Sequence, residues 1–159
     1  MSENATPLDG AAPAECAIAR RMFAADNASQ TLGIEIAHLS PGHAVTTMTV
    51  RDTMVNGHGI THGGYVFTLA DSTFALACNG YESPAVAVRA DIRFLTPSRL
   101  GEQLVAEAVE RARFGRNGIY DVTVRRGDEV IAEFRGDSRT VTIQRRRVPH
   151  VTAPGDAFE

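Results

Sequence analysis

The run of residues over 64–80 constrains this chain most, because it would be apolar on nearly every side of a helix. It reads GYVFTLADSTFALACNG and leaves hardly any polar face. A helix that is hydrophobic nearly all round has to be buried. Gly80, with Pro84 shortly after it, is typical of the end of a helix. We therefore predict one long buried helix, which follows a polar, glycine-rich loop over 55–63.

Asp71 interrupts the apolar surface of this helix. On a wheel of about 100° per residue it falls within roughly 40° of Phe67, on the same side as Phe74 and Cys78. A carboxylate there is costly to bury unless it is hydrogen-bonded, paired or open to a cleft. A partly exposed or backbone-bonded side chain is the common explanation, and a carboxylate that faces a reactive cleft is the functional one.

The start of the helix supplies a second candidate group. Gly63 and Gly64 stand where the helix begins, and the first N–H groups of a helix lack intrahelical partners and lie at the positive end of its dipole. Such a position suits the negative oxygen that develops on a carbonyl under attack. Gly63 and Asp71 are separated by about 12 Å of helix rise, so one helix cannot aim both at one carbonyl. If they act together, the site is shared between two chains of a symmetric dimer.

The segments around this helix indicate the rest of the fold. A short amphipathic helix is expected over 13–28, where Ile18, Met22 and Ala25 recur at helical spacing. A hairpin follows, and further strand-like segments come after the buried helix. The expected strands are 31–39, 44–51, 85–95, 104–113, 118–126 and 130–143. This meander around one hydrophobic helix indicates an α+β fold and not a series of βαβ units.

The length of 159 residues suits one domain, which we place at 13–143 between flexible ends at 1–12 and 144–159. A net charge of −3 argues against non-specific nucleic-acid binding. No stretch approaches the roughly 18 apolar residues of a membrane span, and the N-terminus lacks the features of a signal peptide. The expected location is therefore cytoplasmic, with Cys16 and Cys78 as reduced thiols.

Two groups of residues resemble the signature of a known family. One is NGHG at 56–59 and HGG at 62–64, followed in the helix by Phe67, Leu69-Ala70-Asp71 and Phe74-Ala75; the other is RFL at 93–95 with Pro97 and Gly101-Glu102. Together they resemble the hot-dog-fold acyl-CoA thioesterases of the phenylacetate-degradation (PaaI) type, over about 32–142. The resemblance implies an antiparallel sheet of about six strands wrapped around a central helix. It also implies two protomers that join their sheets, and dimers that pair into a homotetramer.

The resemblance also implies what the site residues do. Asp71 becomes the nucleophile or general base, and the backbone amide of Gly63 binds the thioester oxygen. Asn56 positions the thioester or the attacking water. Ser72, where relatives commonly have Thr, holds that water, and His62 orders the loop or contacts the thioester. The expected reaction is hydrolysis of an acyl-CoA to acid and CoA, with CoA as part of the substrate and no separate cofactor.

These residues leave the acyl group open. Val55, Phe67 and Phe74 are expected to line an apolar pocket at the dimer seam, and the resemblance favours aryl-acyl groups such as phenylacetyl or hydroxylated derivatives. Arginine suits the phosphates of CoA, but the chain offers many arginines and singles out none. His58 and His62 lack the compact spacing of a metal site with Asp71, so we predict no metal.

Two other functions remain as alternatives. A hot-dog hydratase or dehydratase would act on enoyl or 3-hydroxyacyl thioesters, with His62 and an acid as the proton-handling pair. The pair Gly63-Gly64 before an Asp-bearing helix favours hydrolysis over that reaction. A non-catalytic acyl-CoA-binding domain would lose the carboxylate, which this chain retains as Asp71.

Glu102 stands where many relatives have Asp, at the turn after Gly101. We expect this difference to affect the structure of the turn and not the reaction.

Overall fold

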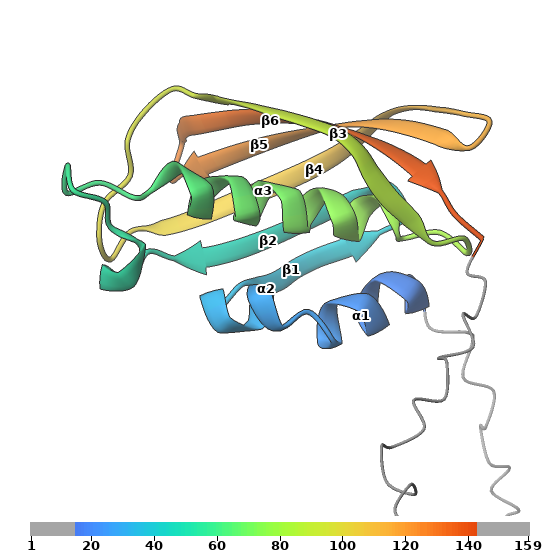
Figure 1. The fold of residues 1–159 in the computed structure, drawn as a ribbon, viewed down its shortest axis with the longest axis horizontal. Coiled ribbons are helices and arrows are strands. Elements are labelled where there is room, and N and C mark those ends of the chain that lie inside the picture. Colours follow the sequence, from blue (N-terminus) through green and yellow to red (C-terminus); the bar gives the residue numbers. More distant parts are fainter. Residues whose placement is uncertain (1–14, 143–159) are drawn as a thin grey trace, which may run out of the picture.

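The fold is one antiparallel sheet wrapped around one helix (Figure 1). A computed structural model describes residues 15–142. Its strands are β1 (Glu35–Ser40), β2 (His43–Thr49), β3 (Ala85–Phe94), β4 (Gln103–Phe114), β5 (Asn117–Arg126) and β6 (Glu129–Thr140), in the order β1-β2-β4-β5-β6-β3. Its helices are α1 (Ala17–Ala24), α2 (Asn27–Leu32) and α3 (Gly63–Cys78), with a 3-10 turn η1 (Asp52–Met54). The predicted α+β architecture of six strands and a central helix is confirmed.

The helix α3 is buried as its sequence predicts, and it contacts every strand of the sheet. Phe74 is fully buried, and its ring lies 5.5 Å from that of Tyr120 and 5.8 Å from that of Phe134 between centroids. Burial of a side chain of this size contributes about 1.5–3 kcal/mol. Phe74 thus belongs to the core between helix and sheet. The prediction that it lines the substrate pocket is wrong, because its ring is used to hold α3 against β5 and β6.

The strands agree with their predicted periods, and their ends shift by a few residues. β5 alternates half-buried and buried side chains along most of its length, so Tyr120, Val122 and Val124 enter the core. β2 alternates in the same way from His43 to Met48. Since side chains of a strand point alternately to its two faces, this pattern follows from one face packing on α3 and the other facing outward.

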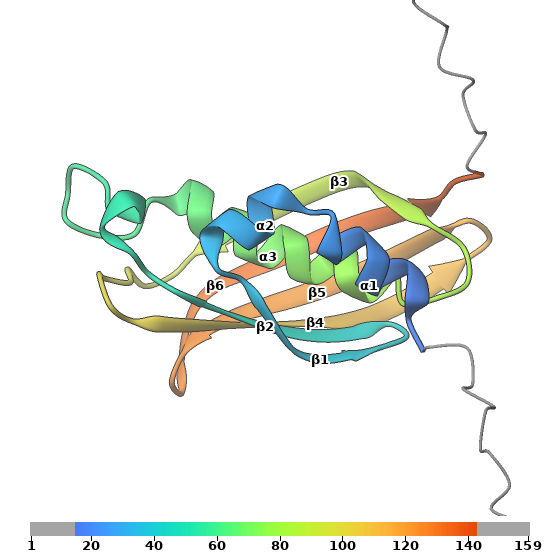
Figure 2. The ribbon, with the colours of Figure 1, turned by 90° about the horizontal axis from the view of Figure 1, so that it is seen from below.

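The N-terminal segment differs from the prediction of one helix over 13–28. The described part holds two short helices, and α2 includes residues 31 and 32, which the strand pattern had assigned to the first strand. The side chain of Asp26 accepts a hydrogen bond from the N–H of Ser29 and so starts a new helix. Gly33, with a φ of 68°, ends it. Both helices contact α3 and lie beside β1 (Figures 1 and 2).

The strand β3 forms one edge of the sheet, and its outer side has no strand partner among residues 15–142. Val86 and Val88 are 48% and 52% exposed on it, and Phe94 at its end is 57% exposed. An unpaired edge is a template for pairing with another strand, and proteins usually cover or break it. This edge carries exposed apolar side chains instead, which suits pairing with a second chain.

Several expectations concern residues outside the described range. The flexible ends predicted at 1–12 and 144–159 both lie there.

None of the helices in the described part of the chain has the length and hydropathy that a membrane span requires. Cys16 and Cys78 are both free thiols, and both are buried.

Candidate active site

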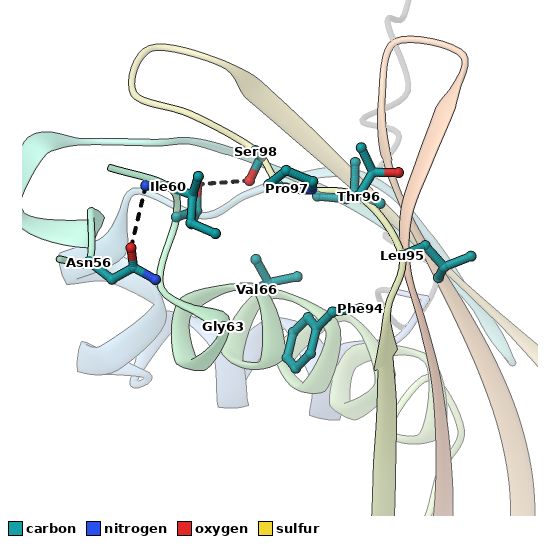
Figure 3. Close-up of a pocket in the computed structure, with 11 residues that line it drawn as sticks. Asn56, Ile60, Gly63, Val66, Phe94, Leu95, Thr96, Pro97 and Ser98 are labelled. Carbon is teal, nitrogen blue, oxygen red and sulfur yellow. Dashed lines mark hydrogen bonds between the residues drawn. The ribbon is translucent and has the colours of Figure 1, made fainter. Parts of the chain in front are cut away.

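A cavity of about 480 Å³ lies between the N-terminus of α3, the loop before it and the end of β3 (Figure 3). Its wall is mostly apolar, with polar groups near the helix end. The lining residues are Asn56, Ile60, Thr61, Gly63, Val66, Phe94, Leu95, Thr96, Pro97, Ser98 and Ile131. Val55 and Phe67 do not line it. The prediction for these two side chains concerns a pocket at the seam of a dimer, and it stays a prediction.

Gly63 is the first residue of α3 and lines the cavity. Its N–H donates to no atom within residues 15–142. A Cβ at this position would lie only 2.9 Å from Cζ of Phe94, so glycine alone lets that ring close over the helix end. The free N–H of Gly63 therefore stands at the positive end of the helix dipole, beside an apolar cavity, where a carbonyl oxygen gains most from a donor.

Asn56 divides its side-chain amide between the loop and the cavity. Its Oδ1 accepts hydrogen bonds from the N–H of His58 at 2.9 Å and from the N–H of Ile60 at 3.4 Å. Because backbone N–H groups only donate, the atom that faces them is the oxygen, and the amide nitrogen points the other way (Figure 3). That nitrogen has no acceptor in the described part of the chain. Asn56 thus shapes the loop and offers two N–H donors at the cavity wall.

His62 caps α3. Its Nδ1 accepts a hydrogen bond from the N–H of Gly64 at 3.0 Å, and the backbone N–H of His62 donates to the carbonyl of Met54 at 2.8 Å. An Nδ1 that accepts from an N–H places the ring proton of a neutral imidazole on Nε2. The ring lines a second cavity, next to Tyr65 and α2, and not the one that Gly63 lines. The cap fits the loop-ordering role implied for His62.

Asp71 lies two turns further along α3, half-buried, and does not line the cavity at the helix end. Its carboxylate accepts no hydrogen bond from residues 15–142. Burial raises its pKa above the usual 3.8, and the nearby charge of Asp26 raises it further. An unpaired, partly desolvated carboxylate of this kind is a candidate catalytic group. Within one chain, however, Gly63 and Asp71 do not meet at one site.

Ser72 is bonded to α2. Its Oγ lies 2.8 Å from Oγ of the fully buried Ser29, which in turn is 2.5 Å from Oδ2 of Asp26. The structure therefore places Asp26 and Ser29 next to the two predicted site residues. Sequence reasoning missed both, because it assigned the first to the interior of a helix over 13–28. The signal that would have found them is the N-cap pattern of Asp26 three residues before Ser29.

The remaining predictions concern a metal and the turn before β4. No group of three or more His, Cys, Asp or Glu side chains among residues 15–142 is arranged to hold a metal ion. Glu102 accepts hydrogen bonds from the N–H of Arg99 at 2.8 Å and from the guanidinium of Arg126 at 2.9 Å. These two donors lower the pKa of Glu102, the guanidinium contributing most. Glu102 thus braces the turn.

Comparisons with known proteins agree with this fold and site. Residues 58–133 match the model of the Thioesterase superfamily. Over 124 residues the chain is 41% identical to acyl-coenzyme A thioesterase PaaI of Escherichia coli K12, which covers 77% of this chain and 89% of that one. The solved structure of E. coli PaaI, from the phenylacetic acid degradation operon, matches with a TM-score of 0.76 at 40% identity, over 79% of this chain and 91% of that one.

A second relative was solved with a ligand. The smu.793 protein of Streptococcus mutans, bound to acetyl CoA, has a TM-score of 0.65 at 26% identity, over 68% of this chain and 88% of that one. The family model covers the cap residue His62, the helix end at Gly63 and the carboxylate of Asp71. From its fold, its loop-to-helix signature and the extent of these matches, the chain belongs to the thioesterase superfamily, in the group of PaaI-type hot-dog acyl-CoA thioesterases.

Proposed function

We propose that the protein hydrolyses acyl-CoA thioesters to the free acid and CoA. The observation that carries this proposal is the free N–H of Gly63, which opens from the N-terminus of α3 onto an apolar cavity. A donor at that place stabilises the negative oxygen of a tetrahedral intermediate, and one such donor typically contributes about 10²–10³ in rate. The named activity of the E. coli relative is of the same kind.

The site is complete only in a dimer. Gly63 and Asp71 lie about 12 Å apart along one helix, so the carboxylate that acts at a given Gly63 comes from the second chain. The exposed edge of β3, with its apolar Val86 and Val88, joins the same edge of the partner and makes one continuous sheet. The homotetramer that the family resemblance implies is a pair of such dimers.

In this dimer each group has one task. The thioester oxygen accepts from the N–H of Gly63, and the side-chain N–H groups of Asn56 hold the thioester or the water in place. Asp71 of the other chain either attacks the carbonyl carbon or takes a proton from the attacking water. The C–S bond then breaks, and the CoA sulfur leaves as thiolate and is protonated. If Asp71 attacks directly, the acyl group is left on its carboxylate as an anhydride, and a water molecule hydrolyses that anhydride to give the free acid and restore Asp71. The Nδ1 of His62 accepts the hydrogen bond that fixes the first turn of α3. The neutral ring then has no free acceptor nitrogen with which to take up a proton in a dehydration.

The acyl group is an aryl-acyl group, phenylacetyl or a hydroxylated derivative. The cavity of about 480 Å³ has the apolar side chains of Val66, Leu95 and Ile131 in its wall, and the ring of Phe94 covers the helix end. Flat aromatic groups stack or meet edge to face with such a ring. CoA enters as part of the substrate, and the reaction needs no separate cofactor.

The test is release of free thiol from phenylacetyl-CoA, hydroxybenzoyl-CoA, hexanoyl-CoA and crotonyl-CoA, measured with a chromogenic disulfide reagent. Both cysteines are buried, and burial raises the pKa of Cys78 to about 12, so the protein itself consumes the reagent slowly. We expect release from the aryl-acyl substrates that Asp71→Asn abolishes. Loss of the enoyl absorbance of crotonyl-CoA without thiol release would indicate a hydratase instead. No reaction with any substrate would contradict hydrolysis and favour a binding domain.

A further inference from the structure

A chain of three side chains links α2 to α3 beside Asp71. The carboxylate of Asp26 accepts from the N–H of Ser29 at 3.0 Å through Oδ1, and its Oδ2 lies 2.5 Å from the hydroxyl of the same serine. That hydroxyl lies 2.8 Å from the hydroxyl of Ser72. Ser29 is fully buried, while Ser72 is half-buried like its neighbour Asp71. The chain therefore runs from an acidic group through a buried serine to a hydroxyl next to the candidate base.

The direction of the hydrogen bonds in this chain follows from the number of protons. An ionised carboxylate can only accept, so the hydroxyl of Ser29 donates to Asp26. A serine has one hydroxyl proton, so the oxygen of Ser29 accepts in its other contact and Ser72 must be the donor there. The only proton of the Ser72 hydroxyl is then used within the protein. What Ser72 offers to a neighbouring molecule is a lone pair.

We propose that Asp26 and Ser29 are positioning residues for hydrolysis, which hold the Ser72 hydroxyl oxygen as an acceptor for the attacking water. This inference rests on the function proposed above and assigns Asp71 the role of general base. The water donates one proton to Asp71 and the other to Ser72, so a lone pair of its oxygen is left for the carbonyl carbon. As the new C–O bond forms, the first proton passes to Asp71; when the C–S bond breaks, that proton goes to the departing sulfur.

The opposite direction would hinder the reaction. A Ser72 that donated to the water would draw electron density from the oxygen that has to attack and so lower its nucleophilicity. On the chain that supplies the base, the groups in contact with the water are Ser72 and Asp71 of α3, and α2 acts through them. The α1–α2 junction, which the sequence pattern did not resolve, thus has a place in the site.

The first test compares Ser29→Ala, Ser72→Ala and the double variant in thiol release. Ser29→Ala keeps the charge of Asp26 and frees the proton of Ser72, so we expect kcat to fall about tenfold with KM unchanged, the effect of one hydrogen bond of about 1.4 kcal/mol. In the Ser72→Ala background the same change has no further effect on kcat. Additive losses in the double variant, or full activity of Ser29→Ala, would overturn the proposal.

A matched control is the hydroxyl pair of Thr46 and Thr73. Their oxygens lie 2.7 Å apart, one residue along α3 from Ser72 but on the face toward β2. Thr46→Val removes this contact, and Thr73 still donates to the carbonyl of Leu69 at 2.6 Å. We expect a change in thermal stability and an unchanged kcat. A fall in kcat equal to that of Ser29→Ala would mean that loosening α3 explains both, and the proposal would fail.

The second test reverses the direction of these hydrogen bonds by exchanging one carboxylate oxygen of Asp26 for an amide nitrogen. Asn at position 26 still caps α2 through its oxygen, but it presents an N–H₂ to Ser29, which then accepts there and donates to Ser72. Asp26→Asn should therefore lower kcat about tenfold when Ser72 is present, and far less in Ser72→Ala. Equal effects in both backgrounds would show that only the charge of Asp26 matters and would overturn the proposal. Wild-type protein without thioesterase activity would instead refute the proposed function.

Discussion

The surroundings of Asp71 stabilise the neutral form of its carboxyl group relative to the ionised form. Burial in the side of α3 raises its pKa, and the charge of Asp26 adds to the effect. A carboxyl group whose pKa is raised by folding contributes stability below its unfolded pKa of about 3.8, and this contribution is lost as the pH rises through the higher pKa of the folded state. At neutral pH the ionised Asp71 therefore destabilises the fold.

Asp71→Asn is expected to increase the free energy of unfolding at pH 7 while it lowers kcat by orders of magnitude. The gain in stability should vanish below about pH 3.8, where Asp71 is protonated in both states. Urea titrations at both pH values measure the first effect, and thiol release measures the second. A less stable Asp71→Asn at pH 7 would contradict the desolvation of Asp71, and near-normal turnover would remove it from the mechanism.

Asn56→Asp separates the two halves of the Asn56 side chain. Aspartate keeps an oxygen for the N–H groups of His58 and Ile60, so the loop and the melting temperature should change little. The N–H₂ at the cavity wall is replaced by a carboxylate oxygen, so kcat/KM should fall by about 10²–10³, the effect of one lost donor. Thermal melting and thiol release check both expectations. A large drop in melting temperature would show that Asn56 has a structural role beyond its loop bonds.

At the scale of elements, the sequence predicted those parts of the fold that depend on local periodicity. The all-round apolar run of α3 and the alternation of the strands predicted their positions to within a few residues. The break at Asp26 was missed because Ile18, Met22 and Ala25 continue one helical pattern up to it. That pattern outweighed the N-cap signal of Asp26, three residues before Ser29.

The site was predictable only in part. Asn56 and Gly63, which line the cavity, were singled out by the family signature, and Gly63 stands out by its chemistry as well. The family signature also includes Phe94 and Pro97, but the sequence did not predict that they line the cavity. They come to the helix end only when β3 pairs with β6. Periodicity carries no information about such distant contacts.

The contact between α3 and β3 also yields a prediction. Gly63→Ala would place a Cβ 2.9 Å from the ring of Phe94, so the ring must move away from the helix end. We expect kcat/KM to fall about tenfold to hundredfold, since a displacement of about 1 Å at a site has effects of that size. Gly57→Ala is the matched control, because its Cβ would meet nothing within 4 Å. Equal activity of the two variants would contradict the tight closure of Phe94 over Gly63.

For the whole molecule, the proposed dimer joins its two chains along the edge of β3, so changes at this edge should affect both the oligomeric state and the activity. Val86 and Val88 are both about half exposed on this edge. The double substitution Val86→Glu and Val88→Glu would put like charges close together across the two-fold axis. We expect the double variant to be monomeric by light scattering and inactive in thiol release. Phe114→Glu, at a site that is 55% exposed at the end of β4, should leave both properties unchanged. An active monomer would contradict the shared site.

The central claim is that each active site combines Gly63 and Asn56 of one chain with Asp71 of the other. It is tested most directly by thiol release from heterodimers of Asp71→Asn and Asn56→Asp, made by co-expression with two affinity tags. Each homodimer should retain about a hundredth or less of the wild-type activity, but in the heterodimer one of the two sites has all its groups intact. The account predicts about half the wild-type kcat per heterodimer, with wild-type KM. Heterodimers as inactive as either homodimer would show that Asn56 and Asp71 act within one chain, and would contradict the account.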